Sequence, residues 1–171
     1  MTVHSDHIVH NSGFALLAAG LCTLLAHVPS VSAEDLPKQG SFAVTYTAAG
    51  ALGRTIDVGD GTRVVAMDNR LIATNDAGQG IFHNATGDCI GVRGGETRNG
   101  YCVFTDKDGD KFVEPWSVAP GAKKGTATLG PGTGNYKGIE GNLEWEVVTS
   151  LPAASGTYNF IGKKRGTYRL P

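Results

Sequence analysis

The stretch of this sequence most suited to chemistry is Asp106-Lys107-Asp108-Gly109-Asp110. Three carboxylates at alternate positions can converge on a hard cation such as calcium, which takes oxygen ligands. An EF-hand is excluded, because its sixth loop position should be Gly and is Lys111, and its twelfth should be a bidentate Glu and is Ser117. The alternative is an acidic hairpin turn in which Asp and Gly supply the required dihedrals. The three aspartates are therefore a candidate calcium site, and no other cofactor is expected.

Patterns typical of a catalytic centre are missing. His83 is the only histidine after residue 33 and has no assigned partner, so it is expected to hydrogen-bond rather than to act as a base. A Gly-x-Ser-x-Gly elbow is absent. The glycines of Gly130 to Gly141 lack the Gly-Lys-Ser/Thr ending of a phosphate loop and predict tight turns instead.

The elements that must position these residues read as strands. Leu143 to Val147 alternates apolar and charged residues, the period of a strand with one buried face. Glu144 and Glu146 fall on the opposite face, which we expect to meet solvent. The other expected strands are residues 42–47, 52–58, 63–67, 71–74, 81–85, 101–105, 111–116, 125–129, 156–161 and 166–170.

About ten short segments without a sustained helical period are typical of an antiparallel sandwich or barrel. The basic run Lys163-Lys164-Arg165 falls between the last two segments and is expected to form a solvated hairpin turn rather than a polyanion site. One domain, residues 34–171, accounts for all of them.

Residues 1–33 resemble a cleavable signal peptide. Phe14 to Val28 is almost continuously apolar, and Val31-Ser32-Ala33 offers the small residues that a signal peptidase reads, although the leader lacks Lys and Arg. The apolar run is shorter than the roughly 20 residues that span a bilayer. A secreted or periplasmic protein, without stable membrane insertion after cleavage, is expected.

The cysteines point to the same oxidising compartment. Cys89 and Cys102 are the only two after residue 33, and an even number there predicts a disulfide. A turn near Gly95 would place them opposite each other, whereas a turn at Asn99-Gly100 would put them out of register.

Charge balance argues against nucleic acid. Removing residues 1–33 leaves 15 basic residues against 15 acidic ones, because Asp6 is the one charged residue lost. Phosphate binding needs a surplus of clustered Lys and Arg.

Aromatic residues recur on the expected strands. Most are expected in the core, but a barrel of about eight strands is just wide enough to hold one small ligand. The candidate pocket residues are Phe42, Tyr46, Trp116, Trp145, Tyr158 and Phe160.

The Asp106 to Asp110 turn, followed by Gly125-Thr126 and by Gly132-Thr133-Gly134-Asn135-Tyr136-Lys137-Gly138-Ile139-Glu140-Gly141, resembles a group of uncharacterised secreted bacterial proteins. Their barrel is like those of allene oxide cyclase and plant dirigent proteins. The resemblance covers roughly the second half of residues 34–171 and implies an eight-stranded antiparallel barrel, a trimer, and an interior that holds an apolar small molecule. The plant catalytic residues map onto no position here.

The sequence therefore predicts an all-β protein, a closed or nearly closed antiparallel barrel of about eight strands behind a cleavable signal peptide. The expected function is non-catalytic binding of a small apolar ligand, or an accessory role. Two alternatives stay open: an isomerase or cyclase, with His83, Tyr136 or an acidic residue inside the mouth of a cavity, and a structural module that forms oligomers.

Overall fold

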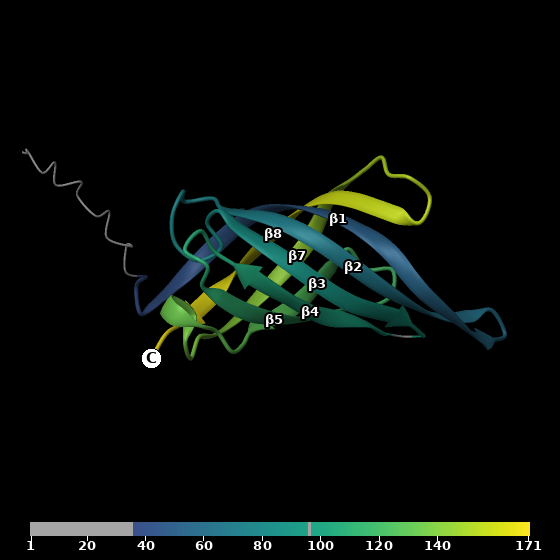
Figure 1. The fold of residues 1–171 in the computed structure, drawn as a ribbon, viewed down its shortest axis with the longest axis horizontal. Helices are drawn as coiled ribbons and strands as arrows, with labels where there is room; N and C mark the ends of the chain where they lie inside the picture. The colour runs from purple at the N-terminus through teal and green to yellow at the C-terminus, as the bar shows by residue number, and fades with distance from the viewer. Residues whose placement is uncertain (1–35, 96) are drawn as a thin grey trace, which may run out of the picture. The chain divides into compact units, whose positions relative to one another are not determined.

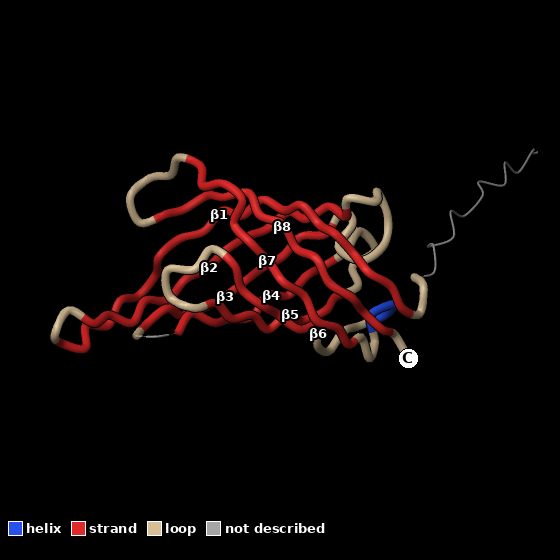
Figure 2. Tube along the Cα trace, turned by 180° about the vertical axis from the view of Figure 1, so that it is seen from behind, coloured by secondary structure: helices blue, strands red, loops and turns tan. Residues whose placement is uncertain are grey.

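The computed structural model of the chain describes residues 36–95 and 97–171. Eight strands follow one another around a closed barrel, each antiparallel to its neighbour, and β1 pairs with β8 to close it (Figures 1 and 2). This confirms the predicted fold class. The predicted signal peptide, residues 1–33, lies outside the described residues. The strands are β1 Gln39–Gly59, β2 Thr62–Asn75, β3 Ala85–Gly94, β4 Thr97–Thr105, β5 Lys111–Val118, β6 Lys124–Leu129, β7 Glu140–Leu151 and β8 Thr157–Arg169.

The first two strands are longer than predicted. The sequence predicted a break near Gly50 and another near Asn69, but both residues lie within strands. Gly50 of β1 pairs directly with Asn69 of β2, and neither residue ends its strand. The Tyr158 hydroxyl donates to the Asp68 carbonyl oxygen at 3.2 Å and also contacts the Asn69 side chain. Inter-strand hydrogen bonds thus override local turn propensity here.

Residues 81–84 were predicted as strand, and this is wrong. They form a turn in which Phe82 and Asn84 have positive φ, and Ile81 and Phe82 are buried. The strand begins only at Ala85. Most of β3 was not predicted, because Gly87, Gly91 and Gly94 interrupt its apolar pattern.

The prediction for Lys163-Lys164-Arg165 is also wrong, because these residues lie inside β8 and not in a hairpin turn. Residues on a strand alternate between the two faces. Lys163 and Arg165 are exposed, whereas Lys164 is buried inside the barrel.

Aromatic side chains pack against one another in one half of the barrel interior. Phe82 packs at 4.9 Å between ring centroids against both Phe104 and Phe112, and Phe112 packs at 4.8 Å against Tyr136. Tyr136 belongs to the 3₁₀ helix η1, Gly134–Tyr136, in the turn between β6 and β7. We call this region, formed by Phe42, Phe82, Phe104, Phe112 and Tyr136, the packed half.

Within the described residues, no helix is long and apolar enough to cross a bilayer.

Candidate ligand-binding cavity

The other half of the barrel is hollow. A cavity of about 410 Å³ extends from the packed half toward the β3–β4 and β7–β8 turns. Its volume falls in the range of small-molecule pockets, roughly 300–1,000 Å³. Its apolar lining comprises Tyr46, Leu52, Met67, Leu71, Trp116, Trp145, Val147, Leu151, Tyr158 and Phe160, together with the Cys89–Cys102 disulfide.

Five of the six candidate pocket residues line this cavity: Tyr46, Trp116, Trp145, Tyr158 and Phe160. Phe42 does not. Its ring lies in the packed half, 5.2 Å from the ring of Phe82 and 6.5 Å from that of Tyr168. Strand alternation predicts that an aromatic residue faces inward, but not how far along the barrel axis it lies.

Inward glycines let the cavity aromatics lie flat against the wall. A Cβ at Gly162 would approach the Tyr46 ring to 2.3 Å, and one at Gly125 would approach the Trp145 ring to 2.6 Å. Carbon atoms do not come this close without displacement. The glycines of the neighbouring strands therefore keep these rings out of the space that a ligand would occupy.

A buried ion pair forms the floor of the cavity. The Lys164 ammonium of β8 lies 2.6 Å from both carboxylate oxygens of Glu114 on β5, and the two side chains are only 3% and 2% exposed. The ammonium also lies 4.4 Å from the ring centroid of Phe104, a residue of the packed half. Both charged residues line the cavity, so they separate the hollow half from the packed half.

Burial and ion pairing have opposite effects on the pKa values of Glu114 and Lys164. Burial raises the pKa of the Glu114 carboxyl, and the adjacent Lys164 charge opposes that rise. Burial lowers the pKa of the Lys164 ammonium, and Glu114 opposes that fall. Burial also raises the pKa of the Tyr46 hydroxyl, with a smaller contribution from Glu114. The floor thus holds groups for which the charged form is costly, a property typical of sites that bind or react.

Sequence reasoning did not single out Glu114 or Lys164, although a signal was present. Phe112, Glu114 and Trp116 alternate along one strand face, and Tyr158, Phe160 and Lys164 share a face of β8. Extending this alternation to Glu114 and Lys164 predicts that both charged side chains face the barrel interior.

Two arginines lie toward the other end of the cavity. Arg93 and Arg98 are directly paired across β3 and β4, beside the turn that joins these strands, and both line the cavity. Tyr158 lies in their field: burial and the Asp68 charge raise the pKa of its hydroxyl to about 12, while Arg98 and Arg93 act in the opposite direction.

The disulfide prediction is confirmed. Cys89 and Cys102 are bonded across directly paired positions of β3 and β4, and Gly94 pairs with Thr97 beyond them. The turn therefore follows Gly94, as the expectation of a turn near Gly95 requires, and Asn99-Gly100 lies within β4.

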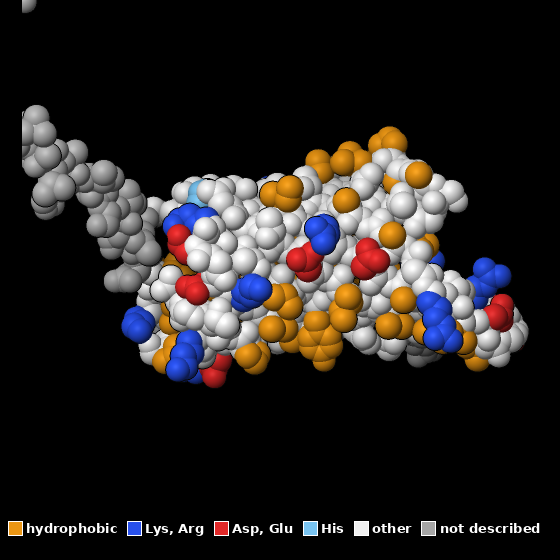
Figure 3. All heavy atoms as spheres, viewed as in Figure 1, with side chains coloured by type: hydrophobic (Ala, Val, Ile, Leu, Met, Phe, Trp, Pro, Cys, Tyr) orange, Lys and Arg blue, Asp and Glu red, His pale blue; other side chains and the backbone are white. Residues whose placement is uncertain are grey.

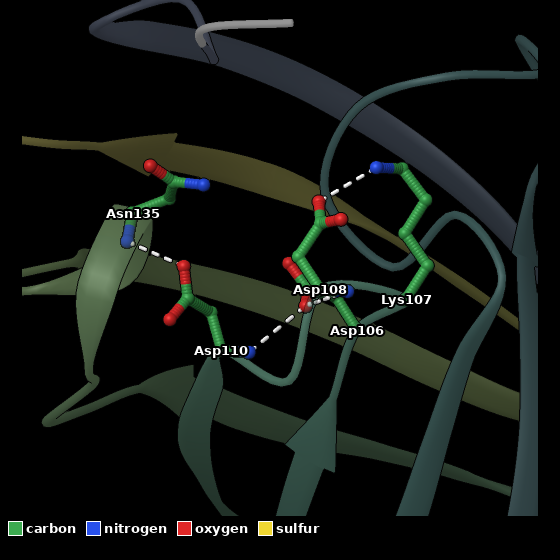
Figure 4. A network of polar contacts seen from close by, with 5 residues as sticks. All are labelled: Asp106, Lys107, Asp108, Asp110 and Asn135. Carbon is green, nitrogen blue, oxygen red and sulfur yellow. Dashed lines mark hydrogen bonds and ion pairs between the residues drawn. The ribbon is translucent and has the colours of Figure 1, made fainter. Parts of the chain in front are cut away.

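The three aspartates of the candidate calcium site are engaged in hydrogen bonds within the protein (Figure 4). Asp106 accepts from the backbone N–H groups of Asp108 and Asp110, at 2.9 and 3.0 Å. Asp108 pairs with Lys107 at 2.6 Å, and Asp110 accepts from the Asn135 N–H at 2.9 Å. No group of three His, Cys, Asp or Glu side chains arranged to hold a metal occurs in the described part of the chain. Calcium binding stays a prediction.

The other expected reactive residues, His83 and Tyr136, lie away from this cavity and line a second hollow of about 420 Å³ together with Asp106 and Asp108. Tyr136 is buried in the packed half, and His83 lies on the turn between β2 and β3, where its Nδ1 atom is buried without a described hydrogen-bond partner. Neither lines the cavity. The acidic residue inside it is Glu114. Glu144 is exposed, as expected, and Glu146 pairs with Lys124 at 3.1 Å on the outer wall.

Apolar side chains also gather on the outer wall, near β4 and β5 in the view of Figure 3. The exposed large apolar residues of β3 and β4 are Ile90, Val92, Tyr101 and Val103. Ile90 and Tyr101 are directly paired, so they form a continuous apolar surface.

The chain matches no protein-family model and no curated protein sequence. Its fold is similar to solved structures of dirigent proteins. The pterocarpan synthase dirigent protein GePTS1 superimposes with a TM-score of 0.50 at 11% identity, over 78% of this chain and 93% of that one. The pterocarpan synthase dirigent protein PsPTS1 gives a TM-score of 0.47 at 12% identity, over 78% and 97%. The closed eight-stranded barrel of this chain is thus also the architecture of dirigent proteins.

Proposed function

We propose that this protein binds one small organic ligand with a largely apolar body inside the hollow half of its barrel, and that it acts as a binding or accessory protein. The observation that carries the proposal is the contrast between the two halves. The rings of Phe82, Phe104 and Phe112 pack directly against one another in one half, whereas the inward side chains of the other half leave about 410 Å³ open between them. Interiors are normally close-packed, so an open volume of this size suits a bound small molecule.

The fold supports the same use of the barrel. A likeness to a dirigent protein described as a pterocarpan synthase is consistent with a barrel that handles a small organic molecule. Because function resides in sites rather than in folds, the lining of the cavity is the stronger argument. Polar side chains also occur in that lining, Glu114, Lys164, Arg93 and Arg98 among them, and such groups fix the orientation of a ligand in an apolar pocket.

The proposal includes export and self-association. The disulfide supports an oxidising compartment, secreted or periplasmic. The paired Ile90 and Tyr101 surface supports a homo-oligomer, for which the family resemblance implies a trimer.

Native mass spectrometry of the protein, purified without denaturation from the periplasm of an expression host, tests all three points. We expect a small molecule that is retained on the folded protein and lost on unfolding. The same spectrum reports the number of subunits and whether the chain begins at Glu34.

Two matched variants show whether that molecule occupies the cavity. Val147→Trp fills the cavity, because Val147 lines it. Val148→Trp makes the same change at the next residue, which is 52% exposed. We expect the molecule to be absent from Val147→Trp and present in Val148→Trp. Retention in both variants would contradict binding in the cavity.

The ion pair favours one second candidate, an isomerase or cyclase that transfers a proton to or from an apolar substrate. Glu114, Lys164 and Tyr46 are ionisable groups inside the cavity, and buried groups with shifted pKa values suit general acid–base catalysis. Incubating the protein with its retained molecule in deuterated water distinguishes the two functions. Carbon-bound deuterium that appears with the native protein and not with Glu114→Gln would establish proton transfer, whereas no incorporation would favour simple binding.

A further inference from the structure

The arginine pair Arg93 and Arg98 is unusual in its register. The two residues are cross-strand partners, on the face of the β3–β4 hairpin that also carries the disulfide, and both line the cavity. Like charges directly opposite each other on neighbouring strands destabilise a sheet. The hairpin therefore carries a local penalty that an anion between the two guanidinium groups would remove.

No described carboxylate forms an ion pair with either arginine. Of the five other described arginines, Arg54 also has no ion pair, whereas four do have a carboxylate partner, in the pairs Arg63–Asp57, Arg70–Asp88, Arg165–Glu146 and Arg169–Glu140. The acid inside the cavity, Glu114, is already neutralised by Lys164. Among the described residues that line the cavity, the two arginines therefore have no carboxylate partner, while the charges at its floor balance each other.

Arg98 also has an unsatisfied hydrogen-bond donor. Its Nε atom is buried and has no acceptor among the described residues. A buried donor without an acceptor is destabilising, and guanidinium groups bind carboxylates and related oxyanions through parallel hydrogen bonds. The missing acceptor and the missing negative charge occur at the same residue.

We infer that the ligand of the cavity is an organic anion, with an apolar body in the hollow half and a carboxylate or similar oxyanion bound by Arg93 and Arg98. This inference rests on the proposed function and adds the chemical class of the ligand. The apolar body lies along Trp116, Trp145 and Phe160, and its far end meets the ion pair at the floor.

Two fluorescent probes with the same aromatic body test the inference: anilinonaphthalene sulfonate, which carries an anionic group, and N-phenylnaphthylamine, which lacks it. We expect the native protein to bind the sulfonate more tightly. Arg93→Gln and Arg98→Gln should each weaken sulfonate binding by about tenfold or more and leave the neutral probe unchanged. Arg54→Gln removes the same charge at an exposed position of β1 that does not line the cavity, and should change neither affinity.

Val147→Trp shows whether the probes enter the cavity, and it should abolish binding of both. Equal affinities for the two probes, with no effect of the arginine variants, would overturn the anionic head group and leave the apolar cavity function standing. Failure of both probes to bind the native protein, or binding that survives in Val147→Trp, would overturn the inference together with the proposed function.

Glu96 follows Gly95 in the sequence and lies outside the described residues, so its charge needs its own variant. If the native protein binds the sulfonate more tightly than the neutral probe, and Glu96→Gln changes this difference little, then Arg93 and Arg98 are available to bind the ligand. Selectivity that appears only in Glu96→Gln would overturn the inference, because the arginines would then serve that carboxylate.

Discussion

Replacing Lys164 by Met should destabilise the barrel strongly, by an amount that depends on pH. The substitution keeps the apolar stem and leaves the 2% exposed Glu114 carboxylate without its partner. Breaking a buried pair in this way typically costs about 3–5 kcal/mol. A second route gives a similar figure. If Glu114 of the variant stays protonated when folded, holding that proton at pH 7 against an ordinary pKa of 4.5 costs about 3 kcal/mol.

The sign of the pH dependence follows from that proton. Glu114 has a raised pKa in the folded state, so the stability that its proton contributes is present below the ordinary pKa and is lost as pH rises toward the folded one. The decrease in the free energy of unfolding caused by Lys164→Met should therefore shrink to about 1 kcal/mol or less at pH 5. Glu114→Leu leaves the buried Lys164 ammonium without its partner. Because burial lowers the pKa of Lys164, the loss of stability in this variant should be larger at pH 7 and should shrink as the pH is raised.

The double variant Lys164→Met/Glu114→Leu separates pairing from burial. Replacing a buried pair by apolar residues is often neutral or stabilising by about 1–4 kcal/mol, so the double variant should be more stable than either single one. Urea unfolding followed by tryptophan fluorescence measures all four proteins, since both tryptophans of the chain line the cavity. Arg169→Met is the matched control: its pair with Glu140 is also 2.6 Å long but 71% and 69% exposed, and should contribute at most about 1 kcal/mol. Equal, pH-independent losses in Lys164→Met and Arg169→Met would refute the reasoning.

Three further predictions concern the wall and the aspartate turn. Replacing both cysteines by Ala should lower the free energy of unfolding by about 3 kcal/mol, measured by urea unfolding, because the disulfide closes a short loop of the unfolded chain; an unchanged midpoint would contradict this. Gly162→Ala should push the Tyr46 ring into the cavity, so titration with N-phenylnaphthylamine should show weaker binding, whereas unchanged affinity would contradict a ring held by that glycine. If the aspartate turn binds calcium, millimolar calcium should raise the melting temperature and Asp110→Asn should remove that increase; no shift in the native protein would leave Asp106, Asp108 and Asp110 as a turn.

Much of the barrel could be predicted because short-range signals point the same way. Alternation around Leu143 to Val147, frequent turn residues and a lone cysteine pair all favour paired antiparallel strands. The predictions were wrong where a neighbouring strand overrides a local preference. Gly50 and Asn69 stay within strands because they face each other, and Lys164 lies inside β8 because strand alternation continues through the basic run.

The candidate site could be predicted only in part. Aromatic residues on strands indicated a lining, and five of the six named do line the cavity. Phe42 was misplaced because its depth along the barrel depends on the stagger of the strands and on Phe82, which a turn inserts into the packed half.

By itself, the sequence determined the strand period, the turns and the single cysteine pair, since these depend on residues close together in the chain or on composition. Only the tertiary structure decided that Glu114 and Lys164, 50 residues apart, form one ion pair, that Arg93 and Arg98 face the same cavity, and that one half of the barrel stays hollow. The physical reason is that barrel closure brings β5 and β8 to one interior. The register of each strand pair then sets which side chains share that space.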